Sequence, residues 1–243
     1  LAEECERIGV DKVCAFGRYA EDTVKAMETY PDLIVGFGYF NLGVDPPTRI
    51  DDFAHMGLKG VKFIRPAQNY DDREYRTVYG RMEGHGLVAI FHLGIVARGA
   101  RDKYLDVDNN RHRPIYLDTI ARAFPDLQIV GAHLGNPWYD EAGMACRWNP
   151  NLFYDLSGST LQKKRPAFLG DLLWWSADSA PYTSPDGPQA WDKIVFGRDV
   201  APAPVADVIV DYERFLPRPP PSPWPPTLAL SATAARTPGA RSA

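Results

Sequence analysis

GLVAIFHLG, residues Gly86–Gly94, is a short apolar run that ends in His-Leu-Gly, and LQIVGAHLG, residues Leu127–Gly135, repeats that arrangement. Each run has the length and composition of a buried strand. The two histidines, His92 and His133, therefore stand at equivalent ends of two strands. Parallel strands bring their carboxyl ends to one edge of a sheet, so this repetition favours a parallel sheet with both side chains at that edge.

Strand-like and helix-like runs alternate along the rest of the chain. Strict alternation with nearly continuous apolar strands favours a parallel sheet covered by helices. Strands are expected at Lys12–Phe16, Leu33–Phe40, Gly60–Ile64, Leu87–His92, Gln128–Ala132, Leu152–Asp155 and Ile194–Phe196. Helices are expected at Ala20–Tyr30, Arg73–Gly84, Pro114–Phe124 and Ala203–Phe215, with an amphipathic stretch around Pro47–His55.

Two architectures fit this alternation, an open doubly wound sheet and a (β/α)8 barrel. A doubly wound sheet usually carries a glycine-rich phosphate turn after its first strand, and here GRYAED follows instead. A barrel places polar residues at the carboxyl ends of several strands. Such residues follow the predicted strands at Arg65, His92, His133, Asp155 and Asp199. We therefore expect an α/β fold, a (β/α)8 TIM barrel, with one strand missing from the count.

The composition restricts the class of protein. The chain has 243 residues, is 45% hydrophobic and carries a net charge of −4, which is ordinary for a globular enzyme and gives no footprint for nucleic acid or a membrane surface. No apolar run approaches the roughly 20 residues that span a bilayer. Three cysteines without C-x-x-C spacing indicate reduced thiols and a cytoplasmic protein. We expect a barrel domain over residues 1–216 and a proline-rich, disordered tail over residues 217–243.

The residues at the strand ends carry the candidate chemistry. Neutral imidazole is the commonest protein ligand for zinc and the usual general base near neutral pH. Asp199, which follows the last predicted strand, could add a carboxylate, although an N-cap for the next helix is the alternative role. His92, His133 and Asp199 together could hold a divalent metal. Equally, one histidine and Asp199 could hold the metal while the other histidine moves protons, and spacing alone does not choose.

Further polar residues are candidates for substrate binding. Arg65, Arg98, Arg111 and Asn136 follow strands or lie in the long loop between two of them, where arginine could hold a carboxylate through two hydrogen bonds. Surface charge is the alternative. His112, in the same loop, is a weaker candidate for substrate contact.

Five blocks, taken in order, resemble the amidohydrolase superfamily. They are GLKGVKFI (Gly57–Ile64), VAIFHLG (Val88–Gly94), FPDLQIVGAHLGNP (Phe124–Pro137), NLFYDLSG (Asn151–Gly158) and DKIVFGRD (Asp192–Asp199). The branch most similar to them contains aminocarboxymuconate semialdehyde decarboxylase, resorcylate decarboxylases and pyrone-dicarboxylate lactonases. The resemblance covers Leu1–Phe215.

This resemblance implies a distorted barrel with one metal ion, usually zinc. By position, His92 is similar to the metal ligand on the family's fifth strand, His133 to the sixth-strand histidine that activates the metal-bound water, and Asp199 to the eighth-strand aspartate at the metal. Some amidohydrolases also carboxylate a fourth-strand lysine between two metals. For Lys62 we favour the simpler role, with its stem packed outside and its amine in solvent. For Asp155, which starts a DLSG turn, we expect a role in ordering the backbone.

The chain departs from the family pattern at three points. It contains no His-x-His, the pair of ligands that ends the family's first strand, and Leu1–Gly17 is similar to the first helix and second strand. The first strand is therefore expected before Leu1, and the chain as given is expected to be truncated, weak in metal binding and inactive. Arg198 stands where relatives carry Ser or Thr, and the proline-rich segment replaces the family's closing helix.

The resemblance implies a metal-dependent hydrolase that acts on a lactone, amide or related carbonyl of a small carboxylate-bearing or cyclic compound. A metal-dependent decarboxylase of an aromatic or muconate-type acid is the alternative. From a different class, a barrel remnant or binding module without catalysis also remains open. The aromatic segment LLWWS (Leu172–Ser176) could pack in a homodimer, but core burial is the preferred interpretation.

Overall fold

A curved, parallel sheet forms the centre of the molecule. The computed structural model describes residues 2–100, 102–104, 106–158, 164–175, 190–198, 205–215 and 235–236. Within these ranges seven strands pair in parallel in the spatial order β7-β6-β5-β4-β3-β2-β1, so each strand lies beside the next one in sequence. The strands are β1 (Val10–Phe16), β2 (Ile34–Phe40), β3 (Gly60–Phe63), β4 (Val88–Phe91), β5 (Ile129–Gly131), β6 (Leu152–Asp155) and β7 (Ile194–Val195).

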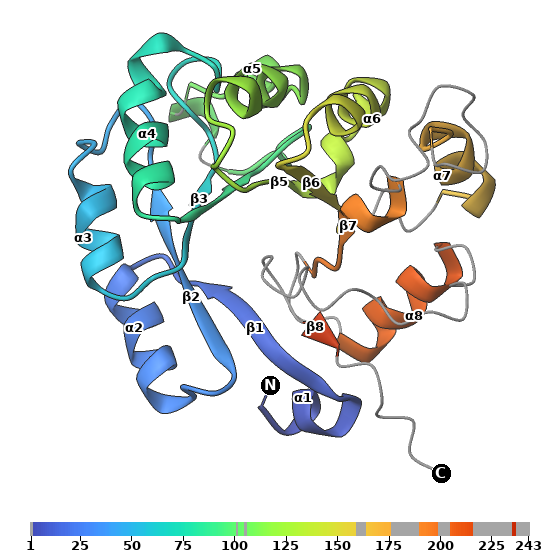
Figure 1. Cartoon of the computed structure of the whole chain (residues 1–243), viewed down its shortest axis with the longest axis horizontal. Helices are drawn as coiled ribbons and strands as arrows, with labels where there is room; N and C mark the ends of the chain where they lie inside the picture. The colour runs from blue at the N-terminus through green and yellow to red at the C-terminus, as the bar shows by residue number, and fades with distance from the viewer. Residues whose placement is uncertain are drawn as a thin grey trace.

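Helices between successive strands cover the outer side of this sheet, as Figure 1 shows for α2 to α6. Strands that are buried on both faces need such a cover, which is why their sequences read as nearly continuous apolar runs. The helices are α1 (Ala2–Ile8), α2 (Ala20–Thr29), α3 (Arg49–His55), α4 (Arg76–Gly84), α5 (Ile115–Ala123), α6 (Tyr139–Trp148), α7 (Pro166–Leu172) and α8 (Val205–Phe215). The α/β, TIM-barrel-type order expected from the sequence is confirmed.

The two edges of the curved sheet do not pair with each other in the part of the chain that the structure describes. At one edge is β7, and at the other β1 pairs with β8 (Ala235–Arg236), which runs antiparallel to it. The described strands therefore form an open barrel. Ala235–Arg236 also belong to the segment expected to be a disordered tail, and the rest of that segment lies outside the described residues.

Alternating side chains divide the core into two layers. On the concave face Cys14, Phe37, Ile90, Val130 and Val195 form one buried cluster. A larger cluster on the other face fills the space between the sheet and the helices. This alternation follows from the two-residue period of a strand. The polar residues that follow the strands lie next to this concave cluster, at the carboxyl ends of the strands.

The position of Lys62 shows that one expectation, an amine in solvent, was wrong. All four residues of β3 are buried, and Lys62 is only 5% exposed. In the sheet register Lys62 lies beside Ile90, so it shares the concave face with that residue. Its Nζ lies 5.7 Å from the centre of the Phe16 ring. The amine therefore points into the barrel rather than into solvent.

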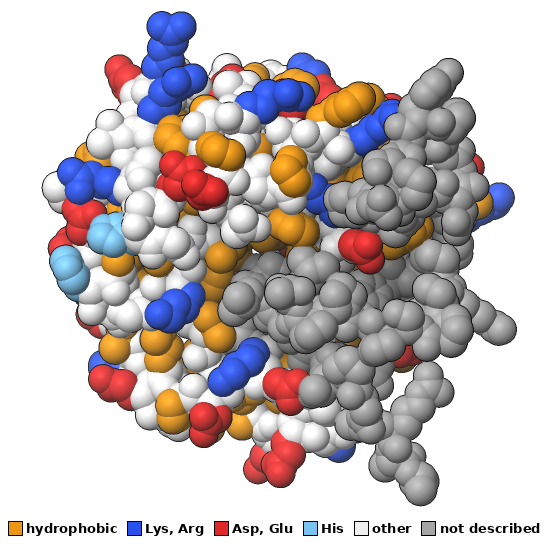
Figure 2. Space-filling view, in the orientation of Figure 1, with side chains coloured by type: hydrophobic (Ala, Val, Ile, Leu, Met, Phe, Trp, Pro, Cys, Tyr) orange, Lys and Arg blue, Asp and Glu red, His pale blue; other side chains and the backbone are white. Residues whose placement is uncertain are grey.

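The described surface agrees with the charge pattern of the sequence. Figure 2 shows acidic and basic side chains interspersed over the visible face, without a patch of one sign. No helix in the described ranges is long and apolar enough to cross a membrane. In the segment LLWWS, Leu172, Leu173 and Trp175 are buried, as expected for a core contact, whereas Trp174 is 43% exposed.

Candidate active site

The two histidines that follow β4 and β5 meet at the carboxyl ends of these strands. His133 Nε2 lies 3.3 Å from His92 Nδ1, and the two ring centres are 4.9 Å apart. The pairing of β4 with β5, which aligns Phe91 with Gly131, puts both residues at the same level of the sheet. The structure thus brings together the pair of histidines that the sequence places on separate strands.

The backbone at His133 has an uncommon conformation. His133 and Leu134 both have positive φ, 61° and 46°, inside the short helical turn Ala132–Gly135 that follows β5. Residues other than glycine rarely adopt this left-handed region, so surrounding contacts must hold it. The backbone N–H of His133 donates to Asp155 Oδ1 at 2.9 Å. Arg65 is the one other described non-glycine residue with positive φ, and it also follows a strand at this site.

Asp155 and Ser157 fix the ring of His133 from the side opposite His92. Asp155 Oδ1 accepts the Ser157 hydroxyl at 2.5 Å and the Ser157 backbone N–H at 2.9 Å. The Ser157 Oγ in turn lies 2.8 Å from His133 Nδ1. Asp155 therefore orders the backbone, as expected from the sequence, and also reaches the histidine through the serine.

A third imidazole, that of His112, packs against the ring of His92. His112 is only 1% exposed, its ring centre lies 5.6 Å from that of His92, and its Nε2 accepts the backbone N–H of Arg65 at 3.1 Å. Tyr70 packs edge-on against His112 and donates its hydroxyl to the carbonyl oxygen of His92 at 2.9 Å. These contacts join the loop containing His112 to the ends of β3 and β4.

Burial keeps two of these imidazoles neutral. Burial first, and then the electrostatic effects of the neighbouring His133, Lys62, His112 and Arg65, lower the pKa of His92 from 6.5 to about 2. Burial also lowers the pKa of His112 to about 4. Neutral imidazole offers a nitrogen lone pair to a metal or a proton, and protonated imidazole does not. At neutral pH, His92 is therefore in the form that a metal ligand requires.

One atom of His92, the ring nitrogen Nε2, is suited to bind the metal that the family resemblance implies. Its Nε2 is buried and has no hydrogen-bond partner in the described part of the protein. A buried nitrogen lone pair without a donor is costly, and a cation would satisfy it. No group of three His, Cys, Asp or Glu side chains that could hold a metal occurs within the described ranges. Asp199, the further ligand expected from the sequence, lies outside them.

The candidate substrate-binding residues differ in their surroundings. The Arg65 guanidinium is 4.0 Å from Asp102, and its side chain is 37% exposed. Arg111 is held at 2.8 Å by Asp106 and also donates to the carbonyl oxygen of Pro66. Arg98 is exposed. Asn136 precedes a cis peptide bond to Pro137, and its Oδ1 accepts the Tyr139 hydroxyl at 2.7 Å. Of the three arginines, Arg65 combines a weak ion pair with an electrostatic effect on His92.

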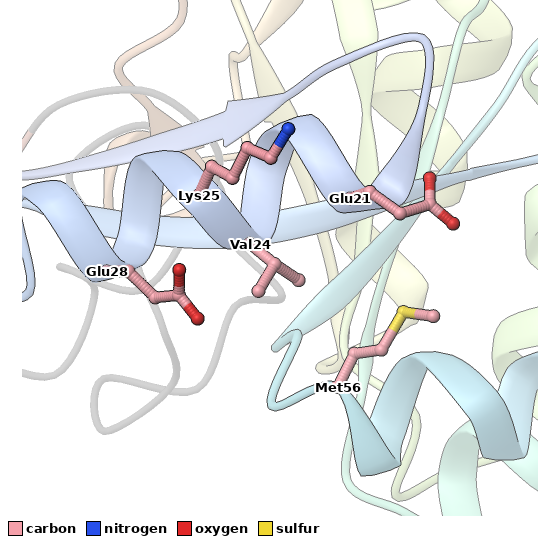
Figure 3. A pocket seen from close by; sticks show the side chains of 5 residues that line it. All are labelled: Glu21, Val24, Lys25, Glu28 and Met56. Atoms are coloured by element: carbon pink, nitrogen blue, oxygen red, sulfur yellow. The ribbon is translucent and has the colours of Figure 1, made fainter.

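A pocket elsewhere on the molecule does not involve these residues. It lies on the helical layer between α2 and the end of α3 (Figure 3). Its lining consists of Glu21, Val24, Lys25, Glu28 and Met56. This mixture of opposite charges around two apolar side chains contains no imidazole, thiol or hydroxyl group, so the histidine cluster remains the candidate site.

Sequence reasoning underestimated Ser157 and His112. Ser157 occurs in the DLSG turn and carries no strand-end signal of its own, but its spacing of two residues from Asp155 is typical of a local side-chain turn. His112 lies in a long loop, and only the tertiary fold brings it against His92. The long loop itself was a usable signal, because long ordered loops are often functional.

Comparison with known proteins supports this description of the fold. The family model described as amidohydrolase matches residues 9–241. No curated protein matches the sequence closely enough to identify a relative.

Among solved structures, the chain is similar to an uncharacterized TIM-barrel protein, Bb4693, from Bordetella bronchiseptica. The TM-score is 0.67 at 19% identity, over 90% of this chain and 75% of that one. It is also similar to the 5-carboxyvanillate decarboxylase LigW from Sphingomonas paucimobilis, with a TM-score of 0.54 at 17% identity, over 82% of this chain and 66% of that one.

A 5-carboxyvanillate decarboxylase from Novosphingobium aromaticivorans, solved with bound manganese and a nitrobenzoic acid, gives a TM-score of 0.54 at 16% identity. That match covers 86% of this chain and 73% of the decarboxylase. The chain thus spans between two thirds and three quarters of the length of these structures, and the likeness concerns the fold.

Proposed function

The chain belongs to the amidohydrolase family, a family of enzymes, and from that premise we propose that it is a metal-dependent hydrolase acting on a lactone, amide or related carbonyl. The single observation that carries the proposal is the contact between His92 and His133 at the carboxyl ends of β4 and β5. It joins the neutral His92 imidazole, whose buried Nε2 has no hydrogen-bond partner among the described residues, to the His133 imidazole, whose Nδ1 is hydrogen-bonded to Ser157.

In this proposal His92 and Asp199 hold the metal, with zinc as the expected ion. When bound, the metal supplies Lewis acidity, which polarises a carbonyl and makes a water molecule more acidic. His133 accepts the proton of the attacking water at Nε2 after the contact of this nitrogen with His92 Nδ1 has opened, and it later returns the proton to the leaving group. The hydrogen bonds that His133 donates to Asp155 and Ser157 keep its ring oriented during both transfers.

Arg65, Arg98, Arg111 and Asn136 bind the substrate in this proposal. Arg65 is the strongest of them, because its guanidinium is partly exposed, is only loosely paired with Asp102 and lies close enough to His92 to affect its pKa. A guanidinium there would attract a carboxylate on the substrate. The preferred substrate is therefore a small carboxylate-bearing or cyclic compound.

Decarboxylation of an aromatic acid is the second candidate. Two structurally similar proteins are 5-carboxyvanillate decarboxylases, one of them solved with manganese and a substituted benzoic acid. An arginine beside the histidines suits the carboxylate of such a substrate as well as that of a lactone acid. In this alternative the same residues hold the metal and the substrate, and manganese replaces zinc as the expected ion.

Metal-dependent turnover tests the proposal. The purified full-length protein is stripped with a chelator, reloaded with Zn²⁺ or Mn²⁺, and assayed on a panel of lactones, amides and hydroxybenzoates. We expect hydrolysis that returns with metal, and a fall in kcat of about 10²–10⁴ in His133→Gln with the metal content unchanged. Release of CO₂ from a hydroxybenzoate without hydrolysis would favour the second candidate. Folded protein that binds no metal and turns over neither class would support a binding module or remnant and overturn both.

A further inference from the structure

The environment of His133 Nδ1 determines where the proton of that ring lies. Asp155 Oδ1 accepts two backbone N–H groups and the Ser157 hydroxyl. A serine hydroxyl has one hydrogen, and the 2.5 Å contact with the carboxylate uses it. The Ser157 Oγ is therefore an acceptor toward His133 Nδ1. The Ser157 carbonyl oxygen, which lies 3.2 Å from the same nitrogen, is always an acceptor. Both contacts require a hydrogen on His133 Nδ1.

The contact between His133 Nε2 and His92 Nδ1 makes the tautomer of His92 depend on that of His133. A neutral His133 with its hydrogen on Nδ1 has a lone pair on Nε2. That lone pair lies 3.3 Å from His92 Nδ1, which must then be the donor. His92 has one ring hydrogen when neutral, so its Nε2 is left with a lone pair. This is the atom that is buried without a hydrogen-bond partner among the described residues.

We infer that Asp155 and Ser157 are positioning residues, which set the tautomers of His133 and His92 so that His92 Nε2 presents its lone pair to a divalent cation. The inference rests on the proposed metal dependence for the identity of the cation, but the direction of the hydrogen bonds follows from this chain's own contacts. Hydrogen-bonded partners of a metal-binding histidine fix its tautomer and orientation in this way. Without the Ser157 hydroxyl, the longer contact with the carbonyl oxygen of residue 157 is what remains of the two contacts that His133 Nδ1 makes with this residue.

The local backbone supports such a role. Gly197 packs so closely on Asp155 that an added Cβ would lie 2.7 Å from the Asp155 Cβ and Cγ. Gly158 packs against the His133 ring, with an added Cβ 3.3 Å from Nδ1. The Tyr212 hydroxyl accepts the N–H groups of Leu156 and Gly197 at 2.8 and 2.9 Å. The carboxylate and the serine therefore sit in a closely packed turn, which restricts their positions.

Nitrogen NMR of the imidazoles in the metal-free protein tests the inference. With ¹⁵N-labelled histidine, long-range ¹⁵N–¹H correlations report which ring nitrogen carries the hydrogen. We expect His133 and His92 both to carry it on Nδ1 in the unaltered protein. We expect mixed tautomers for both rings in Ser157→Ala, and the original pattern in Ser157→Thr, which keeps the hydroxyl. A hydrogen on Nε2 of either ring in the unaltered protein, or unchanged tautomers in Ser157→Ala, would overturn the inference.

A matched control separates this role from loosening of the turn. Tyr212→Phe removes the three hydrogen bonds by which the Tyr212 hydroxyl joins Leu156 of this turn to Gly197, without touching the Asp155–Ser157–His133 contacts. It should lower the melting temperature and leave the tautomers as they are, and mixed tautomers in this variant would contradict a specific role for Ser157. Competition with a chromophoric chelator should also give a Zn²⁺ affinity about 10-fold weaker in Ser157→Ala than in Tyr212→Phe. If the unaltered protein binds no metal, the proposed function fails, and the tautomer measurement still decides this inference.

Discussion

His133 Nε2 lies 3.3 Å from His92 Nδ1, and this contact joins two strands whose histidines are 41 residues apart in sequence. Two neutral imidazoles in such contact have only one hydrogen between the facing nitrogens. The state of one ring therefore limits the state of the other. The contact links the ring proposed to bind metal with the ring proposed to move protons.

Replacement of His92 tests the metal site directly. His92→Ala removes a buried imidazole nitrogen that has no hydrogen-bond partner among the described residues, and we expect Zn²⁺ or Mn²⁺ affinity to fall by on the order of 100-fold. Isothermal titration with each metal measures the change. His85→Ala is the matched control, because His85 pairs with Asp51 on the surface, outside the cluster. Equal loss of affinity in both variants would contradict the assignment of His92.

Arg65 should act on binding of a carboxylate rather than on the chemical step. Loss of a charged hydrogen bond costs about 1.5–3 kcal/mol, so Arg65→Ala should raise KM for a carboxylate substrate by roughly 10- to 100-fold. The KM for an uncharged lactone should change little. Arg122→Ala, which removes an exposed arginine paired with Asp118 on α5, serves as the control. A rise of KM that is equal for charged and uncharged substrates would argue against this role.

Gly94 should be far less tolerant of a side chain than Gly86, although both have positive φ. An added Cβ at Gly94 would lie 2.0 Å from the carbonyl oxygen of Asn136, whereas Gly86 has nothing within 4 Å. Gly86→Ala should cost about 1–2 kcal/mol from its backbone conformation alone. Gly94→Ala should cost at least about 2 kcal/mol more, because the loops after β4 and β5 must separate. Urea unfolding of both variants measures the difference, and equal losses would mean that the close approach is relaxed in solution.

The buried His112 should make the folded protein sensitive to acid. The unfolded chain protonates this residue near pH 6.5, but the folded protein does so only near pH 4. Between these values the unfolded state binds more protons, so the free energy of unfolding falls as the pH decreases, by up to about 1.4 kcal/mol per pH unit. Above pH 6.5 this residue adds no pH dependence.

His112→Gln keeps an acceptor for the Arg65 N–H and removes the titration. Urea unfolding of the metal-free protein between pH 4 and 7 should therefore show a shallower slope for the variant. Parallel curves for the two proteins would mean that His112 is protonated equally in the folded and unfolded states.

The helix α6 illustrates what the pattern of apolar residues could not reveal. Apart from Tyr139 in its first turn, its buried residues are small, and Ala142, Ala145 and Cys146 fall at helical spacing without the large apolar residues that usually mark an amphipathic helix. The strands were easier to predict. Apolar runs such as Gly60–Phe63 are buried on both faces, so every residue along them is selected to be apolar or able to reach the core.

The sequence by itself determined the alternation of strands and helices, the barrel class, and the places of His92 and His133 at strand ends, because these depend on local periodicity and on the parallel direction of neighbouring strands. Tertiary structure alone decided that Lys62 points into the barrel, that His112 packs behind His92, and that Asp155 reaches His133 through Ser157. Such contacts join residues from different strands and loops. Their distances depend on how the sheet curves and how the loops pack over its edge, which no local pattern of residues records.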